Sequence, residues 1–414
     1  MQTEAQVASA EIERINAKLP KLIEFEDPFW AWIKSNSKAG MVSDRDMRVP
    51  LKVRTGAQYR QFNSDGGSLG RGGGPDYTHA IVSTVANTTA MEWSFKTGWA
   101  TSSRRKAVIN AVRDNMNDGL KEHNRAMDAQ LVGDGSARLG TVGVVDTTAK
   151  TTTITGNFGV RRLRENNFYQ VYSLSAGALS TYRGREQVLD VDDAGGILTW
   201  HTLPSGIASG DVLVVDGATD KSDSPTAVEA FLGVQYHHNS ASTGTWLGIN
   251  RATYPQIRGN SVDAGGAFHL KTVREVRNKV GNRLGKSAVK KMTAWMHPEQ
   301  KDRYEGMAQL VSTIMKEPRG QKMDLYFGDG LQLAGSPIMT HYSWDNSRID
   351  FMNRGLWHRA VMKELHMLKN GSNNIFPLYD TTDGGVLSAQ ISYYASQMQV
   401  WMDNPAMSCY ISNT

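Results

Sequence analysis

The sequence predicts an α+β protein in which one long helix lies between regions rich in β-strands. Residues 102–131 carry apolar side chains at every fourth position and contain no proline, which is typical of a helix with one apolar face. Short runs of alternating apolar residues, separated by Gly, Asn, Asp and Pro, lie on either side of this stretch. Glycine accounts for 40 of the 414 residues, above the usual ~7%, as a turn-rich protein requires.

The composition is that of a globular chain, because 40% of the residues are hydrophobic and 21% are charged. A length of 414 residues allows two or three domains of ~100–200 residues. The net charge of +5 is small, and Lys and Arg look dispersed along the chain. We therefore do not expect tight, sequence-specific binding to nucleic acid, although weak contact with a polyanion stays open.

Compartment signals are few. Cys409 is the single cysteine, so no intrachain disulfide can form, and we expect it to be a buried small hydrophobe. The first 19 residues are polar and charged, unlike a secretory signal, and no apolar run reaches the ~20 residues of a membrane helix. These features predict a protein made in the cytoplasm that has no membrane partner.

The N-terminal region begins with helical spacing over residues 3–19, which ends at Pro20. The aromatic stretch LIEFEDPFWAWI follows at 22–33 and is suited to anchoring this region on a surface. A 17-residue helix is marginal alone, so it must dock. The sequence leaves open whether it docks on another molecule or on the core of its own domain.

Residues 48–97 predict a long hairpin. One strand runs through RVPLKVRTGAQYRQF, a tip follows with six glycines between Gly66 and Gly74, and HAIVSTVANTTAMEWSFKTGW returns. An isolated two-stranded ribbon is marginal in water, so we expect it to lie on another subunit. The tip lacks the GK[ST] ending of a phosphate-binding loop, which argues against a nucleotide site.

The central helix is expected over 102–131. Its predicted apolar stripe contains Val108, Val112, Met116, Leu120, Met127 and Leu131, and its opposite face is polar and rich in arginine. Gly119 in its middle should weaken it by ~1 kcal/mol relative to Ala. Gly133 is suited to a left-handed residue that ends the helix.

The remaining chain mixes short strands and helices. Residues 141–218 predict a small β-barrel or sandwich, in which Asp190, Asp192 and Asp193 form a solvated turn and not a calcium loop. Residues 219–250 are loop-like. Over 268–285 we expect an amphipathic helix broken at Gly281 and Gly285, and Pro298 is placed to start another helix. The chain ends in a strand.

No motif predicts catalysis or metal binding. HExxH and CxxC are both absent. His237 and His238 would point to opposite faces of a strand, and His358 and His366 lie two turns apart on a plausible helix. The tryptophans and tyrosines are dispersed, as in core and interface packing. The densest basic patches favour solvated faces, with DNA phosphates or an acidic neighbour as the sharper alternative; they are Arg104, Arg105 and Lys106, and then Arg161, Arg162 and Arg164.

The order of these parts resembles the major capsid proteins of tailed bacteriophages, which have the HK97-like fold. The resemblance covers nearly the whole chain. It rests on element order and on segments such as GDGSARLG after the long helix, TGTWLGINRATYPQIRGN at 243–260, MDLYFGDGLQLAGSPIMTHYSWDNSRIDFMN at 323–353 and the terminal SAQISYYASQMQVWMDNPAMSCYI. No single one of these segments is decisive.

The resemblance implies six regions. They are an N-terminal arm over 1–47, an extended E-loop hairpin over 48–97, a peripheral domain with the spine helix over 98–140, a β-rich insertion over 141–218, an axial domain with its connections over 219–388, and a strand returning to the peripheral domain over 389–414. Arg54, Arg60 and Arg71 are the E-loop candidates for subunit contacts. Arg104, Arg105 and Lys106 of the spine helix are candidates for the inner surface or for a neighbour's arm.

The function that the resemblance implies is structural. Subunits would form the hexamers and pentamers of an icosahedral shell around double-stranded DNA, assembled in the host cytoplasm and present in the virion. The family has no catalytic site, cofactor or metal to transfer. A separate scaffolding protein, a portal and, in some relatives, a decoration protein are implied partners. Two alternatives remain: an encapsulin-type nanocompartment shell with the same fold, or a carbohydrate-binding or carbohydrate-active β protein.

Overall fold

A computed structural model describes residues 28–34, 39–42, 46–100, 111–266, 269–314, 332–369, 375–379 and 386–413. The predicted helix over 3–19 and the triplet Arg104, Arg105 and Lys106 lie outside these residues. The chain forms two compact units. One contains described residues of 86–127 and 363–397, and the other contains those of 28–85, 128–362 and 398–414. None of the helices described has an apolar stretch long enough to cross a bilayer.

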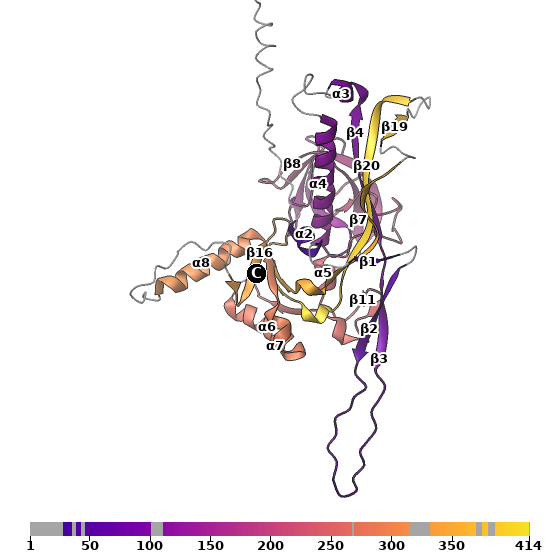
Figure 1. The fold of residues 1–414 in the computed structure, drawn as a ribbon. Coiled ribbons are helices and arrows are strands. Elements are labelled where there is room, and N and C mark those ends of the chain that lie inside the picture. Colours follow the sequence, from indigo (N-terminus) through magenta and orange to yellow (C-terminus); the bar gives the residue numbers. More distant parts are fainter. Residues whose placement is uncertain are drawn as a thin grey trace, which may run out of the picture. The chain divides into compact units, whose positions relative to one another are not determined.

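The first unit is built from long strands and one long helix (Figure 1). Its strands are β4 (Val85–Ser94), β19 (Phe376–Tyr379), and parts of β18 (Trp357–Met367) and β20 (Val386–Met402). β20 pairs with β4, β18 and β19, and the pair with β19 is antiparallel. The helices are α3 (Phe95–Ala100) and most of α4 (Ala111–Leu131). His358 and His366 therefore lie on strand β18 and not on the helix that their spacing predicted.

Helix α4 shows the predicted helix over its described part, but its buried face differs from the predicted stripe. Of the predicted stripe, Met127 and Leu131 are buried, whereas Val112, Met116 and Leu120 are half-buried. The buried positions of the described helix also include Gly119, His123, Arg125, Asp128 and Ala129, so polar residues share the buried face. Gly119 lies where a strand approaches closely: a Cβ there would be 2.2 Å from the Sδ of Met91 in β4.

The end of α4 corrects a second expectation. Gly133 does not adopt a left-handed conformation; the first left-handed residue after the helix is Gly135, with φ of 81°. The reason for glycine at 133 is space, because a Cβ there would be 2.7 Å from the guanidinium of Arg162.

The second unit contains a six-stranded sheet of order β13-β21-β17-β14-β16-β15. Its strands are β13 (Asn260–Asp263), β14 (Thr293–Met296), β15 (Gln332–Leu333), β16 (Ser336–Thr340), β17 (Arg348–Met352) and β21 (Cys409–Ser412). Helices α6 (Leu270–Leu284), α7 (Lys286–Lys290) and α8 (Pro298–Ile314) accompany it, and α6 packs against β13 and β21. Cys409 is fully buried, as predicted.

Helix α6 is not broken at Gly281. It runs through that residue and ends at Leu284, before Gly285, whose φ of 86° is left-handed. A Cβ at position 281 would lie 3.6 Å from Val289 Cγ2, an ordinary van der Waals distance, so the packing there does not require glycine. Helix α8 begins at Pro298, as the sequence predicts.

Residues 138–215 form a closed barrel of order β10-β5-β6-β9-β8-β7. Its strands are β5 (Arg138–Asp146), β6 (Thr151–Thr155), β7 (Phe168–Ser175), β8 (Ala178–Asp192), β9 (Ile197–Trp200) and β10 (Val212–Val215). Its core includes Val171, Leu198 and Trp200, all at most 1% exposed. The indole N–H of Trp200 donates to Thr152 Oγ1 at 2.9 Å.

The hairpin is shorter than predicted. β2 (Met47–Arg54) pairs with β3 (Asp76–Val82), but the return run does not continue in this ribbon. It restarts as β4, which pairs with β20. The other short elements are α2 (Pro28–Lys34), β1 (Ala39–Met41), α5 (Val234–His237), β11 (Thr245–Trp246), β12 (Ile249–Asn250), η1 (Pro255–Ile257), η2 (Arg354–Leu356) and η3 (Pro405–Met407).

Candidate assembly surfaces

The hairpin of β2 and β3 is anchored at its base. Met47, Val49 and Leu51 alternate along β2 and pack against an apolar cluster that contains Ala80 and Val82 of β3, both fully buried. The ribbon is held there by apolar packing and by a backbone hydrogen bond, in which the N–H of Ile81 donates to the carbonyl of Leu247 at 2.9 Å.

Beyond this base, residues 55–75 form a loop that extends past the ends of β2 and β3 (Figure 1). The two arms of the loop touch where the N–H of Gly73 donates to the carbonyl of Gly56 at 3.0 Å. A Cβ on Gly56 would lie 2.1 Å from the carbonyl oxygen of Gly73. The close approach of the two arms therefore requires glycine at position 56. Near the tip, Asn63 Oδ1 accepts from the N–H of Asp65 at 3.1 Å and forms a local turn.

Apolar side chains on this loop are in water. Tyr59 is 90% exposed, Leu69 74% and Phe62 58%. Arg60 and Arg71 on the loop and Arg54 at the end of β2 are exposed as well. Large apolar side chains on an extended loop are not buried in the isolated chain and contribute little to its stability. Their exposure is typical of a surface that contacts another molecule. The role of the three arginines stays a prediction.

Helix α2 packs against its own unit. Phe29 and Ile33 are fully buried, and the Phe29 ring meets the edges or faces of Trp295, Trp344 and Trp357 at centroid distances of 5.2–5.6 Å. The N–H of Trp30 donates to Asp128 Oδ1 at 2.6 Å. The aromatic stretch thus anchors the chain on its own core from residue 28 onwards.

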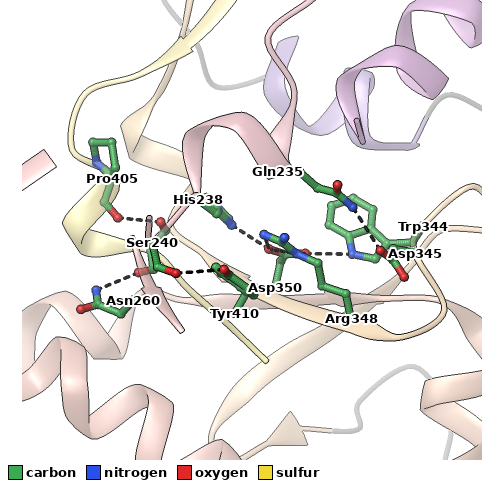
Figure 2. A network of polar contacts seen from close by, with 11 residues as sticks. Gln235, His238, Ser240, Asn260, Trp344, Asp345, Arg348, Asp350, Pro405 and Tyr410 are labelled. Atoms are coloured by element: carbon green, nitrogen blue, oxygen red, sulfur yellow. Dashed lines mark hydrogen bonds and ion pairs between the residues drawn. The ribbon is translucent and has the colours of Figure 1, made fainter. Parts of the chain in front are cut away.

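A buried polar network ties α5 to the sheet (Figure 2). Asp350 of β17 is 1% exposed and accepts from His238 Nδ1 at 2.8 Å and from the indole N–H of Trp344 at 3.1 Å. The guanidinium of Arg348 donates to both carboxylate oxygens at 2.8–3.0 Å and lies 3.8 Å from the ring centroid of Tyr410. His237 and His238 sit at the end of a short helix, not on a strand, and both are fully buried.

The electrostatics of this network fix its protonation. Burial alone would raise the pKa of Asp350, but Arg348 and His238 outweigh burial and lower that pKa to about 2. Burial holds the pKa of His238 below its usual range. The neutral histidine and the carboxylate paired with arginine are closed to water, so removing either partner of Asp350 would leave a buried charge less well compensated.

A second buried histidine joins α4 to its strands in the first unit. His123 is 1% exposed; its ring nitrogens lie 3.0 Å from Thr89 Oγ1 and 3.2 Å from both Asn87 Nδ2 and Ser396 Oγ. Burial lowers the pKa of His123 to about 4. This cluster could not be predicted from the sequence, because its partners come from strands far apart in the chain.

Of the two predicted basic patches, one lies outside the described residues, and the arginines of the other, at 161, 162 and 164, are buried or half-buried. Arg162 is 7% exposed, and its Nε donates to the carbonyl of Ala129 at 3.0 Å, so it does not belong to a solvated face. Arg161 contacts His297. Among the described residues, a dense group of basic side chains lies on α6 and α7, although Lys and Arg look dispersed in the sequence as a whole. The sequence signal was readable as the run KTVREVRNKVGNRLGKSAVKK. No group of three or more metal-ligating side chains occurs among the residues described.

Comparisons with known proteins concern the fold. No family model matches the chain, and no curated protein matches it significantly. The capsid asymmetric unit of cyanophage A-1(L) matches with a TM-score of 0.53 and 9% identity over 97% of this chain and 96% of that chain. The chain has the α+β fold of a phage capsid protein. The capsid of a native GTA particle matches with a TM-score of 0.49 and 11% identity, over 100% of this chain and 99% of that chain. The SrpI encapsulin of Synechococcus elongatus PCC 7942 matches with a TM-score of 0.46 and 8% identity, over 99% of this chain and 95% of that chain.

The capsid fold confirms the resemblance drawn from element order. The finer names, from N-terminal arm to return strand, stay predictions.

Proposed function

We propose that this chain is the major capsid protein of a tailed bacteriophage and assembles into the hexamers and pentamers of an icosahedral shell around double-stranded DNA. The observation that carries the proposal is the match to a phage capsid subunit over 97% of the chain. The protein then acts mechanically, in the virion, after assembly in the host cytoplasm.

The elements take the following proposed roles. Residues 1–47 are the arm, which α2 fastens to its own subunit. Within the region 48–97, the E-loop consists of β2, β3 and the loop between them. Helix α4 is the spine of the peripheral domain. The barrel is an insertion, residues 219–388 supply the axial domain, and residues 389–414 return to the peripheral domain. Partners are a separate scaffolding protein, a portal and a decoration protein.

The physical basis is repeated burial. Closed symmetry lets one chain bury the same surface many times. Tyr59, Phe62 and Leu69 project from the subunit, and covering them on a neighbour stabilises assembly at about 25 cal/mol per Å2 of apolar area, before ordering costs. The two glycines at the loop's crossing leave the loop beyond them free to meet pentamer and hexamer neighbours at different angles.

The test is assembly of the purified chain. We expect size-exclusion chromatography and negative-stain electron microscopy to show rings or closed shells, alone or with the scaffolding protein encoded beside it. A chain that remains monomeric under both conditions contradicts the proposal. Shells that enclose a protein cargo encoded with the chain, and no DNA, would favour the encapsulin alternative.

The carbohydrate alternative loses its support in the barrel. Trp200 is the barrel's tryptophan, and it is 1% exposed with its N–H bound, so it offers no stacking face to a sugar. The exposed Phe168 ring is already covered by the guanidinium of Arg185, whose Cζ lies 3.8 Å from the ring centroid.

A further inference from the structure

The solvent face of α6 and α7 concentrates the positive charge of the chain. Between residues 270 and 291 there are eight basic residues and one acidic residue, Glu275. The basic residues are Lys271, Arg274, Arg277, Lys279, Arg283, Lys286, Lys290 and Lys291. This segment has a net charge of +7, while the whole chain has +5, so the rest of the chain nets −2. We call these residues the α6–α7 basic face.

The fold holds this face outward. Val273, Val276 and Val280 of α6 are fully buried in the cluster that covers the sheet. Between these positions Lys271, Arg274 and Lys279 are exposed, as are Lys286 and Lys290 of α7. The helix cannot roll to hide its cations without exposing the three valines, so the charge is presented in a fixed arrangement.

Some cations of the face also brace it. Arg277 contacts the carbonyl of Ala334 and donates to that of Val289, Lys279 donates to Ser261 O at 2.9 Å, and Arg283 donates to Arg258 O at 3.0 Å. These bonds fix the helix ends and the neighbouring loops. Lys271, Lys286 and Lys290 have no such bond within the described residues, so their charges are available to a ligand.

We propose that the α6–α7 basic face binds the phosphate backbone of double-stranded DNA and is therefore turned toward the packaged genome. The proposal rests on the capsid function proposed above and names the surface that meets the DNA. Binding is independent of sequence, because contacts to phosphates carry no sequence information.

The length of the face fits a duplex. Helix α6 has 15 residues and spans about 22 Å at 1.5 Å per residue. Duplex DNA carries one negative charge per ~1.7 Å of its axis, so several phosphates lie within reach. Amides add neutral donors: a hollow of ≈480 Å3 is lined by Lys271, Arg274, Glu275, Asn278, Lys279 and Asn282.

A lipid surface fits less well. A basic amphipathic helix binds a membrane by burying its apolar face among the headgroups and acyl chains. Here that face is already packed on the sheet, with the valines at 0% exposure.

A protein partner also fits less well. The cores of protein interfaces are depleted in lysine and enriched in aromatic residues, whereas surfaces that bind nucleic acid are polar and strongly positive. Leu270, at 39% exposure, is the one large apolar side chain exposed between residues 270 and 291. The face has no aromatic anchor.

The test measures binding of the full-length, unassembled chain to a fluorescent 30-base-pair duplex of random sequence as salt is raised. The test variant is Lys271→Gln/Lys286→Gln/Lys290→Gln, which keeps the bracing bonds. The control variant is Lys221→Gln/Lys363→Gln/Lys369→Gln, which removes three exposed lysines elsewhere.

We expect the test variant to bind about 10–100-fold more weakly at low salt, with the slope of log K against log salt reduced by about 2–3. The control variant should bind like the wild type. Equal loss in both variants, or none in the test variant, overturns the proposal. The proposal is also overturned if poly-glutamate displaces the fluorescent duplex as well as unlabelled DNA of the same charge does. The α6–α7 basic face would then fit an acidic protein equally well.

The assembly assay separates this inference from the proposed function. If the test variant forms normal shells and its DNA binding is unchanged, the proposal that the α6–α7 basic face binds DNA is refuted and the proposed capsid function is not affected. A chain that binds DNA through this face and never assembles would refute the capsid function. Circular dichroism and the Tm of each variant establish that it is folded.

Discussion

Gly119 of α4 and Gly306 of α8 both lie inside helices, and their surroundings are opposite. Gly119 of α4 faces Met91, which is 4% exposed and hemmed in, with Sδ and Cγ at 2.2 and 2.7 Å from where a Cβ would be. Gly306 of α8 is exposed and has no neighbour within 4 Å of such an atom. From the sequence alone each looks like the same helix-weakening residue. Only the fold shows that one provides space for a strand and the other provides nothing.

Replacing these residues separates the two roles. Gly119→Ala should lower the free energy of unfolding by ~1–3 kcal/mol, because it overpacks the contact between α4 and β4. Gly306→Ala, the matched control, should raise it by ~0.4–1 kcal/mol, because alanine restricts the unfolded chain and favours helix. Urea unfolding of unassembled subunits measures both. Destabilisation by Gly306→Ala, or a neutral Gly119→Ala, would show that the close approach of Met91 is not what selects glycine.

At the scale of elements, the residue pattern predicted those helices and strands whose formation depends on nearby residues in the sequence. The helix start at Pro298, the long helix and the succession of short strands in 141–218 could be read from spacing and turn residues. The split of the return run after β3 could not, because β4 leaves the ribbon to pair with β20, some 300 residues away. The same limit hid His123, whose partners Thr89 and Ser396 meet only in the folded unit.

The hairpin can be cut without disturbing its base. Gly56 and Gly73 are hydrogen-bonded neighbours, so replacing residues 57–72 with Asn-Gly closes the ribbon with a favourable two-residue turn. The subunit Tm should change by less than about 2 °C, because the anchoring residues Val49, Ala80 and Val82 remain. Assembly yield, measured by sedimentation and microscopy, should fall at least ~10-fold, because Tyr59, Phe62 and Leu69 are lost. Shells at wild-type yield would show that the loop is not a contact between subunits.

At the scale of the whole molecule, the distribution of charge and the barrel decide how the chain is used. The sequence showed a net charge of +5 but not its placement, because apolar burial of α6 is what sorts the cations of 270–291 to the outside. The barrel is closed on itself and begins and ends at the same place, since Arg138 of β5 pairs with Val214 of β10. A closed barrel leaves no free sheet edge for a neighbour. This arrangement suits an insertion carried by the capsid body.

The barrel nevertheless supports its own subunit, which gives a prediction with two variants. Replacing residues 139–213 with Asn-Gly removes the contacts of Arg161 with His297, of Arg162 with Ala129 and of Asn157 with Ser347. We expect the subunit Tm to fall by about 5–10 °C, at ~2–4 °C per kcal/mol, while shells of unchanged diameter still form.

The full-length variant Arg161→Gln/Arg162→Gln loses the arginine contacts but keeps the barrel, and should show a large part of the same fall in Tm. Calorimetry of unassembled subunits and microscopy of the shells decide the outcome. If the double variant assembles and the deletion does not, although the deleted subunit remains folded, the barrel itself contacts neighbouring subunits. The barrel would then belong to the shell and would not be an addition to it.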